Sequence, residues 1–321
     1  NIGNLSISVP IVQGGMGVGI SLSGLASAVA NEGGVGVISS AGLGLLYRNL
    51  SKDYIQASIM GLKEELRKAR EKTKGVIGVN VMVAMSNFAD MVKTAIAEKA
   101  DIIFSGAGLP LNLPSFLQKD SVTKLVPIVS SARAAKVIAE KWHNLYNYLP
   151  DAFVVEGPKA GGHLGFKDEQ INDEHFSLEH ILPEVIAEVK DLEVHYGKDI
   201  PVIVAGGIYT GEDIKRFMDM GAAGVQMGTR FVTTDECDAS DIFKQTYIEA
   251  KQEDIQIIKS PVGMPGRAIH NAFLEKVAKQ KEHITHCFRC LEKCNPTQAP
   301  YCITQALIRA VEGDVENGLI F

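Results

Sequence analysis

The sequence lacks the features that mark several other classes of protein. It has no uninterrupted apolar run of about 18 residues, so a membrane-spanning helix is not expected. Its formal net charge is −6 and no basic cluster stands out, which argues against a nucleic-acid partner. The first residues have neither the basic stretch nor the long apolar core of a secretion signal. These absences predict a soluble, cytoplasmic protein.

Signatures of common nucleotide and zinc sites are also missing. Neither the glycine pattern of a Rossmann dinucleotide site nor the G-x-x-x-x-G-K-[ST] phosphate loop occurs where a strand is expected to meet a helix. The eight histidines show no H-E-x-x-H spacing. The sequence therefore predicts neither a Rossmann or P-loop protein nor a metalloprotease.

Cysteine is scarce, with five residues in a chain of 321. In a reducing cytoplasm such thiols stay free unless they hold a metal. Cys237 stands alone, whereas four cysteines in the order C-x2-C-x3-C-x7-C are candidate ligands of zinc or an iron–sulfur cluster: Cys287, Cys290, Cys294 and Cys302. The spacing matches neither the bacterial ferredoxin pattern nor a paired C-x2-C zinc site. Free thiols that simply pack in the C-terminal region are therefore an equal alternative.

The chain does contain eight short apolar segments that alternate with helical patterns. They cover residues 9–12, 35–38, 75–83, 101–104, 125–129, 152–155, 201–205 and 223–227. Strands that are apolar along their length belong in a parallel sheet covered by helices, either open and doubly wound or closed. The count of eight and the repeated Gly, Ser or Asn at the strand ends favour a (β/α)8 TIM barrel over residues 1–235. Ser21 is the expected N-cap of the first helix.

Residues 236–321 differ in pattern from this repeat. We expect a smaller, mostly helical lobe that packs on the barrel and carries the cysteine cluster. Helical spacing covers 242–259 and 303–311, and glycine and proline predict a loop over 260–271. The chain ends on apolar residues 319–321, so either this end docks on the barrel or the natural chain continues beyond it.

Two glycine-rich strand ends indicate a phosphate site. Ala205-Gly206-Gly207 ends the seventh strand, and Gln226-Met227-Gly228-Thr229 ends the eighth. In a (β/α)8 barrel these two loops commonly bind phosphate, because glycines let backbone N–H groups approach the oxygens. The alternative is that the glycines only make tight turns. A phosphate at this place with a flat ring across the barrel mouth suggests flavin mononucleotide (FMN). Gln13, Gly14, Gly15 and Met16 would lie against the ring, and Asn80 would face its pyrimidine edge.

A histidine lies in a glycine-rich loop after the sixth strand. His163 follows Gly161 and Gly162, which leave room for a ligand to approach. A neutral imidazole is a suitable base near neutral pH, so His163 is the candidate catalytic residue. Lys159 and Ser130, the latter after the fifth strand, are candidate pocket residues, although a loop lysine is more often only solvated. Glu156 at the strand end either orients His163 or faces water.

Six motifs in order make the chain resemble the nitronate monooxygenase (2-nitropropane dioxygenase) family, to which the flavin-type enoyl-acyl-carrier-protein reductases are related. They are PIVQGGMG at 10–17, GVNVMV at 78–83, SGAG at 105–108, EGPKAGGHLG at 156–165, VAGGI at 204–208 and QMGTRF at 226–231. The resemblance covers about the first 270 residues. It implies a (β/α)8 barrel with FMN at the carboxyl ends of the strands and Gly162 and His163 beside the flavin.

The resemblance leaves the reaction open between two enzymes. In the monooxygenases the matching histidine is the base that takes a proton from the α-carbon of a nitroalkane, and dioxygen is the second substrate. The products are a carbonyl compound and nitrite. The reductases instead use NAD(P)H to reduce an enoyl thioester. A flavoprotein without catalytic activity is a third hypothesis, and a homodimer is compatible with the sequence.

Overall fold

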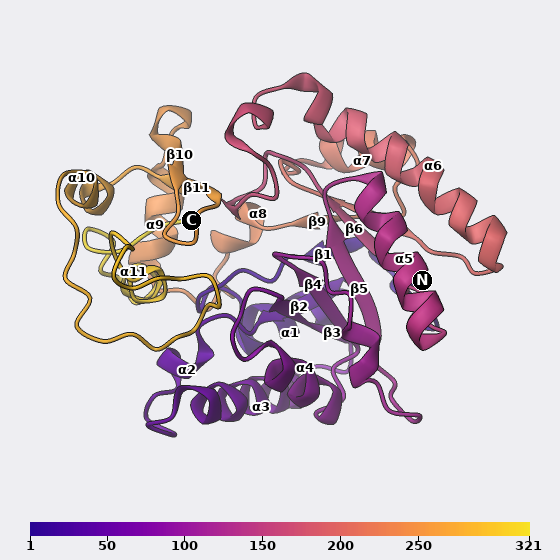
Figure 1. The fold of residues 1–321 in the computed structure, drawn as a ribbon, viewed down its shortest axis with the longest axis horizontal. Helices are drawn as coiled ribbons and strands as arrows, with labels where there is room; N and C mark the ends of the chain where they lie inside the picture. Colours follow the sequence, from indigo (N-terminus) through magenta and orange to yellow (C-terminus); the bar gives the residue numbers. More distant parts are fainter.

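Eight parallel strands close into a barrel in the computed structural model, which describes residues 1–321 (Figure 1). Each strand pairs with the next, and the eighth pairs with the first. In order around the barrel they are β1 (Ile11–Gln13), β2 (Val35–Ser39), β3 (Val76–Met82), β4 (Ile102–Gly106), β5 (Lys124–Val129), β6 (Phe153–Glu156), β8 (Val202–Ala205) and β9 (Gly224–Met227). The predicted TIM barrel is confirmed, and the segments expected from apolar runs are the strands observed.

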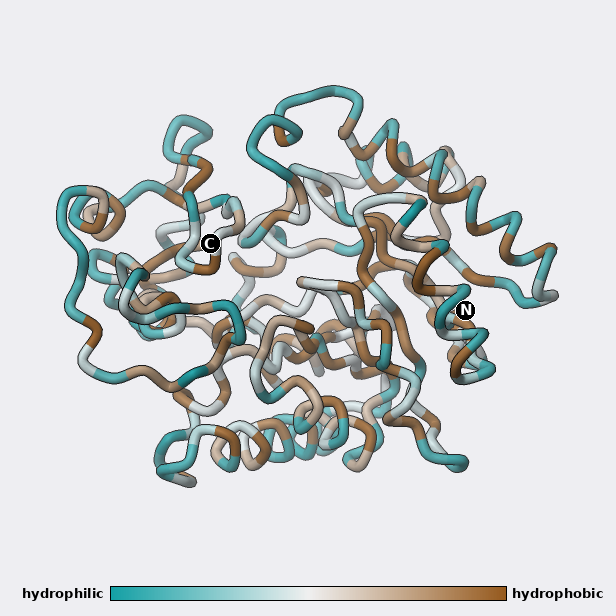
Figure 2. The backbone as a smooth tube through the Cα atoms, in the orientation of Figure 1, coloured by the Kyte–Doolittle hydropathy of each residue, from teal (hydrophilic) through white to brown (hydrophobic).

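Alternate residues of the strands serve two separate cores. Val35 and Val37 of β2 belong to a cluster that fills the barrel interior, whereas Ile38 belongs to the larger cluster beneath the helices. Phe104 and Ile103 of β4 divide in the same way. Because successive side chains of a strand point to opposite faces, a strand that is apolar at every position fits only a sheet buried on both sides. Figure 2 shows the resulting hydrophobic colouring of the barrel strands.

Helices form the outer layer of the barrel. They are α1 (Ser23–Asn31), α2 (Leu43–Leu46), α3 (Tyr54–Lys72), α4 (Phe88–Ala97), α5 (Ala132–Tyr146), α6 (Leu178–Tyr196), α7 (Gly211–Asp219) and α8 (Thr229–Val232). Their apolar stripes supply Leu62, Leu66 and Trp142 to the core beneath them. None of the helices combines the length and the apolarity needed to cross a membrane.

The expected cap of α1 is wrong. Ser21 instead hydrogen-bonds the backbone of Met16, and α1 begins two residues later at Ser23. Asp238 takes the capping role, because its carboxylate accepts hydrogen bonds from the backbone N–H groups of Leu22, Gly24 and Leu25 at 2.7, 3.0 and 3.1 Å. A residue more than 200 positions away in the sequence thus ties the C-terminal region to the start of the barrel.

Asp238→Ala is expected to lower the free energy of unfolding by about 1–2 kcal/mol, the upper part of the range for a lost N-cap. Three backbone N–H groups lose their acceptor together. Urea denaturation measures this loss. Asp238→Asn keeps one acceptor oxygen, so its free energy of unfolding should lie between those of the wild type and Asp238→Ala. A stability of Asp238→Ala equal to that of the wild type would contradict the capping role.

The C-terminal region contains three helices and, unexpectedly, a β-hairpin. The helices are α9 (Asp241–Glu249), α10 (Ala272–Lys279) and α11 (Ile303–Val311), and the hairpin joins β10 (Ile255–Lys259) to β11 (Pro265–Ile269). The helix expected over 242–259 is therefore wrong beyond Glu249, and the loop expected over 260–271 contains a strand. Residues 255–259 alternate between exposed and half-buried positions, as a strand at a surface does. The last predicted helix is confirmed over 303–311.

A third strand joins this hairpin to the barrel. β7 (Gly162–His163) pairs antiparallel with β11, with His163 opposite Gly266. The apolar end of the chain docks here as well, because the N–H of Ile269 donates to the carbonyl of Ile320 at 3.0 Å, and Ile320 is fully buried. The division after residue 235 stays a prediction, and the two parts share a sheet.

Candidate functional site

The loop after β1 meets strand β3 through Gly15 and Asn80. A Cβ atom added to Gly15 would lie only 2.3 Å from the Cβ of Asn80, so the backbone and this side chain are in direct contact. The backbone oxygen of Asn80 accepts hydrogen bonds from Ser40, whereas its half-buried carboxamide bonds nothing in the chain. The predicted residues Gly15 and Asn80 therefore place a glycine backbone beside a carboxamide that has no hydrogen-bond partner in the chain.

Gln13 supports this loop with its side chain. The carboxamide is fully buried, accepts from the N–H of Val37 at 3.0 Å and donates to the carbonyl of Val37 at 3.2 Å. It thereby ties the short strand β1 to β2. The Gln13 side chain is already engaged, so the part of this segment open to a ligand is the backbone that follows it.

The loops after β8 and β9 present backbone N–H groups without acceptors. Gly206, Gly207 and Gly228 donate to no acceptor in the chain, and all three are at least partly exposed. Gly206 and Gly207 have φ values of +101° and +81°, which only glycine adopts readily. A Cβ on Gly228 would lie 3.4 Å from the sulfur of Met16, so the β1 and β9 loops are neighbours. Free N–H groups at strand ends are the arrangement that binds phosphate.

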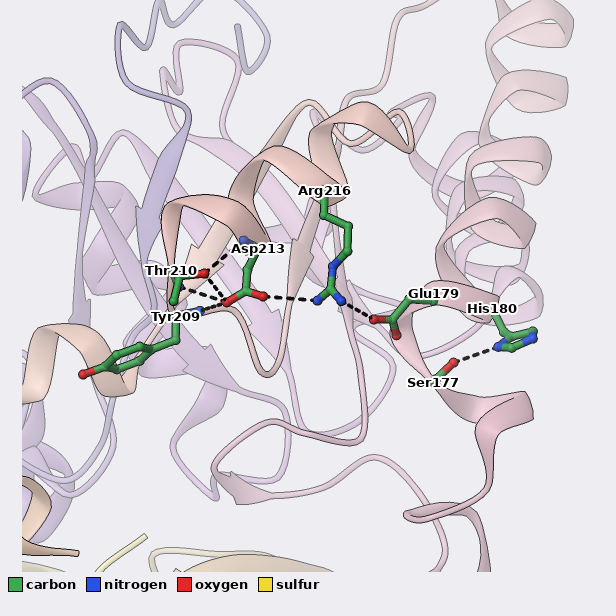
Figure 3. A network of polar contacts seen from close by, with 7 residues as sticks. All are labelled: Ser177, Glu179, His180, Tyr209, Thr210, Asp213 and Arg216. Carbon is green, nitrogen blue, oxygen red and sulfur yellow. Dashed lines mark hydrogen bonds and ion pairs between the residues drawn. The ribbon is translucent and has the colours of Figure 1, made fainter. Parts of the chain in front are cut away.

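A polar network fixes the chain after the β8 glycines (Figure 3). The Asp213 carboxylate accepts from the N–H groups of Tyr209 and Thr210, and Thr210 Oγ1 accepts from the N–H of Asp213 at 3.1 Å. Arg216 bonds Asp213 and also reaches Glu179 on α6 at 3.2 Å. This capping box holds the start of α7 in place, and with it the loop that carries Gly206 and Gly207.

The side chain of Arg230 links the β9 loop to the β8 loop. The guanidinium of Arg230, which follows β9, lies 4.9 Å from the ring centre of Tyr209, which follows β8. Arg230 is exposed and adds a positive charge close to the free N–H groups. Arg230 belongs to the QMGTRF motif, but its contact with Tyr209 forms only in the folded chain.

His163 is held by residues of the C-terminal region. Its Nε2 lies 2.6 Å from Ser260 Oγ, and its ring packs edge-on against Phe321 at a centroid distance of 5.0 Å. Nδ1 has no partner in the chain. Burial lowers the pKa of His163 to about 4, because the charged imidazolium is poorly solvated there. The side chain is therefore neutral at ordinary pH, as a base must be.

The loop between Glu156 and His163 is pinned from the hairpin. Arg267 Nη1 donates to the carbonyls of Pro158 and Ala160, each at 2.7 Å. Lys159 in this loop is exposed and lies against Gly207, with its Cβ 2.8 Å from where a Gly207 Cβ would stand. The structure thus brings Lys159 to the β8 loop.

Ser130 reaches the other side of the histidine loop. Its Oγ lies 2.8 Å from the position of a Cβ on Gly165.

Sequence reasoning missed Ser260 and Arg267, because both lie in the segment for which it expected a loop without strands.

Glu156 ends β6 opposite Ala205 of β8 and has no hydrogen-bond partner or ion pair. Burial raises the pKa of this carboxyl to about 7, because its charged form is desolvated without compensation. It therefore titrates near neutral pH at the edge of the site, a position typical of functional carboxyls.

Glu156→Gln is expected to stabilise the protein at pH 8 and to leave stability nearly unchanged at pH 4. The folded pKa of about 7 exceeds the value near 4.3 of an unfolded glutamate, so the folded state binds more protons between them. Stability of the wild type consequently falls as pH rises through this window. Urea denaturation at both pH values measures the difference, with the exposed Glu212→Gln on α7 as control. An equal effect of Glu156→Gln at both pH values would contradict the raised pKa.

The four clustered cysteines line one small cavity, and none of the strand-end motif residues is part of its lining. All are free thiols. No three His, Cys, Asp or Glu side chains of the chain lie close enough together to hold a single metal ion.

Comparison with known proteins agrees with the fold. The model of the nitronate monooxygenase family matches residues 2–321. A probable nitronate monooxygenase of Staphylococcus saprophyticus is 26% identical over 305 residues, covering 88% of this chain and 81% of that protein. FabK from Thermotoga maritima superimposes with a TM-score of 0.73 at 28% identity, over 98% of this chain and 86% of that one.

A further relative has a different named activity. It is the (3aS,4S,5R,7aS)-5-hydroxy-7a-methyl-1-oxo-octahydro-1H-indene-4-carboxyl-CoA dehydrogenase of Mycobacterium tuberculosis, 29% identical over 273 residues. The match covers 85% of this chain, which spans about two thirds, 66%, of the dehydrogenase. Since the family model covers nearly every residue, the chain belongs to the nitronate monooxygenase family of flavin-dependent oxidoreductases.

Proposed function

We propose that the protein is an FMN-dependent nitronate monooxygenase, which converts alkyl nitronates and nitroalkanes with dioxygen into carbonyl compounds and nitrite. The observation that carries this proposal is a neutral, half-buried His163 beside strand-end loops with free N–H groups. The reaction balances when two nitronates and one dioxygen give two carbonyl compounds and two nitrite ions.

The residues present fit FMN. The free N–H groups of Gly206, Gly207 and Gly228 would hold its phosphate, helped by Thr229 and by the positive charges of Lys159 and Arg230. The backbone of Gly14, Gly15 and Met16 would lie against the ring, with the free amide of Asn80 at its edge and Gly162, Ala205 and Gln226 around it. When bound, the flavin supplies the electron transfer that side chains cannot.

His163 would act as the base toward neutral nitroalkanes. Its Nε2 faces Ser260, so the open Nδ1 is the atom available to a substrate. If Nε2 carries the ring hydrogen and donates a hydrogen bond to Ser260 Oγ, Nδ1 has a free lone pair. This lone pair takes the proton from the carbon next to the nitro group. Ser260 thus positions the ring and selects the tautomer, and Phe321 limits its rotation.

Oxygen uptake tests this proposal. FMN-loaded protein mixed with propyl nitronate in air should consume dioxygen and release nitrite in step with it. Absence of both between pH 6 and 9, a range in which the imidazole of His163 is neutral, would overturn the assignment.

The second candidate is an NAD(P)H-dependent reductase of enoyl thioesters. The name of the M. tuberculosis relative specifies a CoA thioester, which favours a thioester as the alternative class of substrate. Rapid bleaching of the flavin by NADH or NADPH together with turnover of crotonyl-CoA would select this function. Bleaching without thioester turnover would not.

A further inference from the structure

The four cysteines of residues 287–302 lie around one cavity although they form no disulfide bonds. All four line one cavity together with the apolar Ile284, Phe288 and Ile303. Cys290 is buried and the other three are half-buried. The fifth cysteine, Cys237, is buried in a different cluster, where its thiol faces the carbonyl of Ile20. Convergence is thus specific to the four residues of the C-x2-C-x3-C-x7-C pattern.

Three of the four sulfur atoms have a hydrogen-bonding group nearby, and for Cys290 either partner can be the donor. The N–H of Arg289 lies 3.4 Å from Cys287 Sγ, and Thr304 Oγ1 lies 3.1 Å from Cys290 Sγ. Cys302 is the N-cap of α11, and the N–H groups of Thr304 and Gln305 point to its sulfur. Donors of this kind stabilise thiolates and are the usual surroundings of metal-bound cysteine sulfur.

We propose that Cys287, Cys290, Cys294 and Cys302 are the ligands of an iron–sulfur cluster. A single zinc ion needs its four sulfurs about 2.3 Å from one point. No three of the side chains approach closely enough for one ion, yet all four face the same space. In a four-iron cluster each thiolate binds a different iron atom, so the sulfurs stand farther apart than around a single ion, which fits this arrangement better.

The cysteine segment is fixed to the loop that follows β3 of the barrel. The N–H of Ser86 donates to the carbonyl of Cys290 at 3.2 Å, and the N–H of Glu292 donates to the carbonyl of Ala84 at 3.0 Å. Met85 and Leu291 form a β-bridge between these bonds. The loop so held follows β3, the strand of Asn80, so the cluster lies near the mouth of the barrel. Nitronate oxidation does not require this site, and the proposal is independent of that function.

The test is the iron and sulfide content of the full-length protein. Protein purified without oxygen and treated with ferrous iron and sulfide should bind both, and after reduction with dithionite it should give an electron paramagnetic resonance signal once the flavin is removed. The double variant Cys290→Ser/Cys302→Ser should lose the iron, the sulfide and the signal. Cys237→Ser is the matched control and should retain all three.

Bound FMN reports separately whether the barrel of each variant is folded. Wild-type protein that holds FMN but neither iron nor sulfide would overturn the proposal. So would zinc bound without sulfide, or an FMN-loaded double variant with the iron content of the wild type. A double variant that fails to bind FMN is replaced by Cys294→Ser, for which the same loss of iron and sulfide is expected and an unchanged content would overturn the proposal.

Discussion

His163→Asn is expected to lower kcat/KM for a neutral nitroalkane by about 10²–10⁴-fold, the usual contribution of a general base. Asparagine keeps a polar group of similar size but cannot take a proton at neutral pH. The imidazole of His163 is half-buried and neutral, and its Nδ1 has no hydrogen-bond partner in the chain. Steady-state oxygen uptake with nitroethane measures the effect.

The matched control is a second substrate, assayed with the same variant. A pre-formed nitronate has already lost the proton, so His163→Asn should retain much more of its activity on ethyl nitronate than on nitroethane. An equal loss on both substrates would mean that His163 does not act as the base. In the wild type, the neutral form is active and predominates above its pKa, so activity on nitroethane should decline only as pH falls toward about 4.

Gly207→Ala is expected to weaken FMN binding by about 10–100-fold. The φ of +81° is strained for alanine, and the new Cβ would lie 2.8 Å from the Cβ of Lys159, so the loop must shift. That shift removes one hydrogen bond to phosphate, worth about 1.5–3 kcal/mol where the acceptor is charged, and each 1.4 kcal/mol is tenfold in affinity. Fluorescence titration of the flavin-free protein with FMN measures the change.

The control for this variant is Gly211→Ala at the start of α7. No atom lies within 4 Å of a Cβ added there, so FMN affinity should match the wild type. Wild-type affinity in Gly207→Ala, or the same weakening in both variants, would contradict a phosphate site at the β8 loop.

The barrel was predictable because each of its strands carries a local signal. Residues 35–38 and 101–104 are apolar at nearly every position, which only a sheet buried on both faces explains. The strand Gly162–His163 escaped prediction because its partner β11 lies about 100 residues later in the sequence. The Asp238 cap escaped for the same reason, since nothing near α1 in the sequence marks it.

The candidate site also combines residues that a local sequence signal marks with residues that only tertiary contacts reveal. Glycines at strand ends marked Gly15, Gly207 and Gly228 directly, because glycine is needed where the backbone itself must meet a ligand. Ser260 and Arg267, which hold His163 and its loop, became visible only through tertiary contacts. Gln13 was placed correctly in the loop, but its side chain bonds β2, which a sequence pattern does not reveal.

The most direct measurement is an anaerobic titration of the FMN-loaded protein with propyl nitronate. We expect the absorption of the bound flavin to change on addition of nitronate, and nitrite to appear when air is admitted. A flavin spectrum that nitronate leaves unchanged, but that NADH or NADPH bleaches at once, would contradict the assignment as a nitronate monooxygenase.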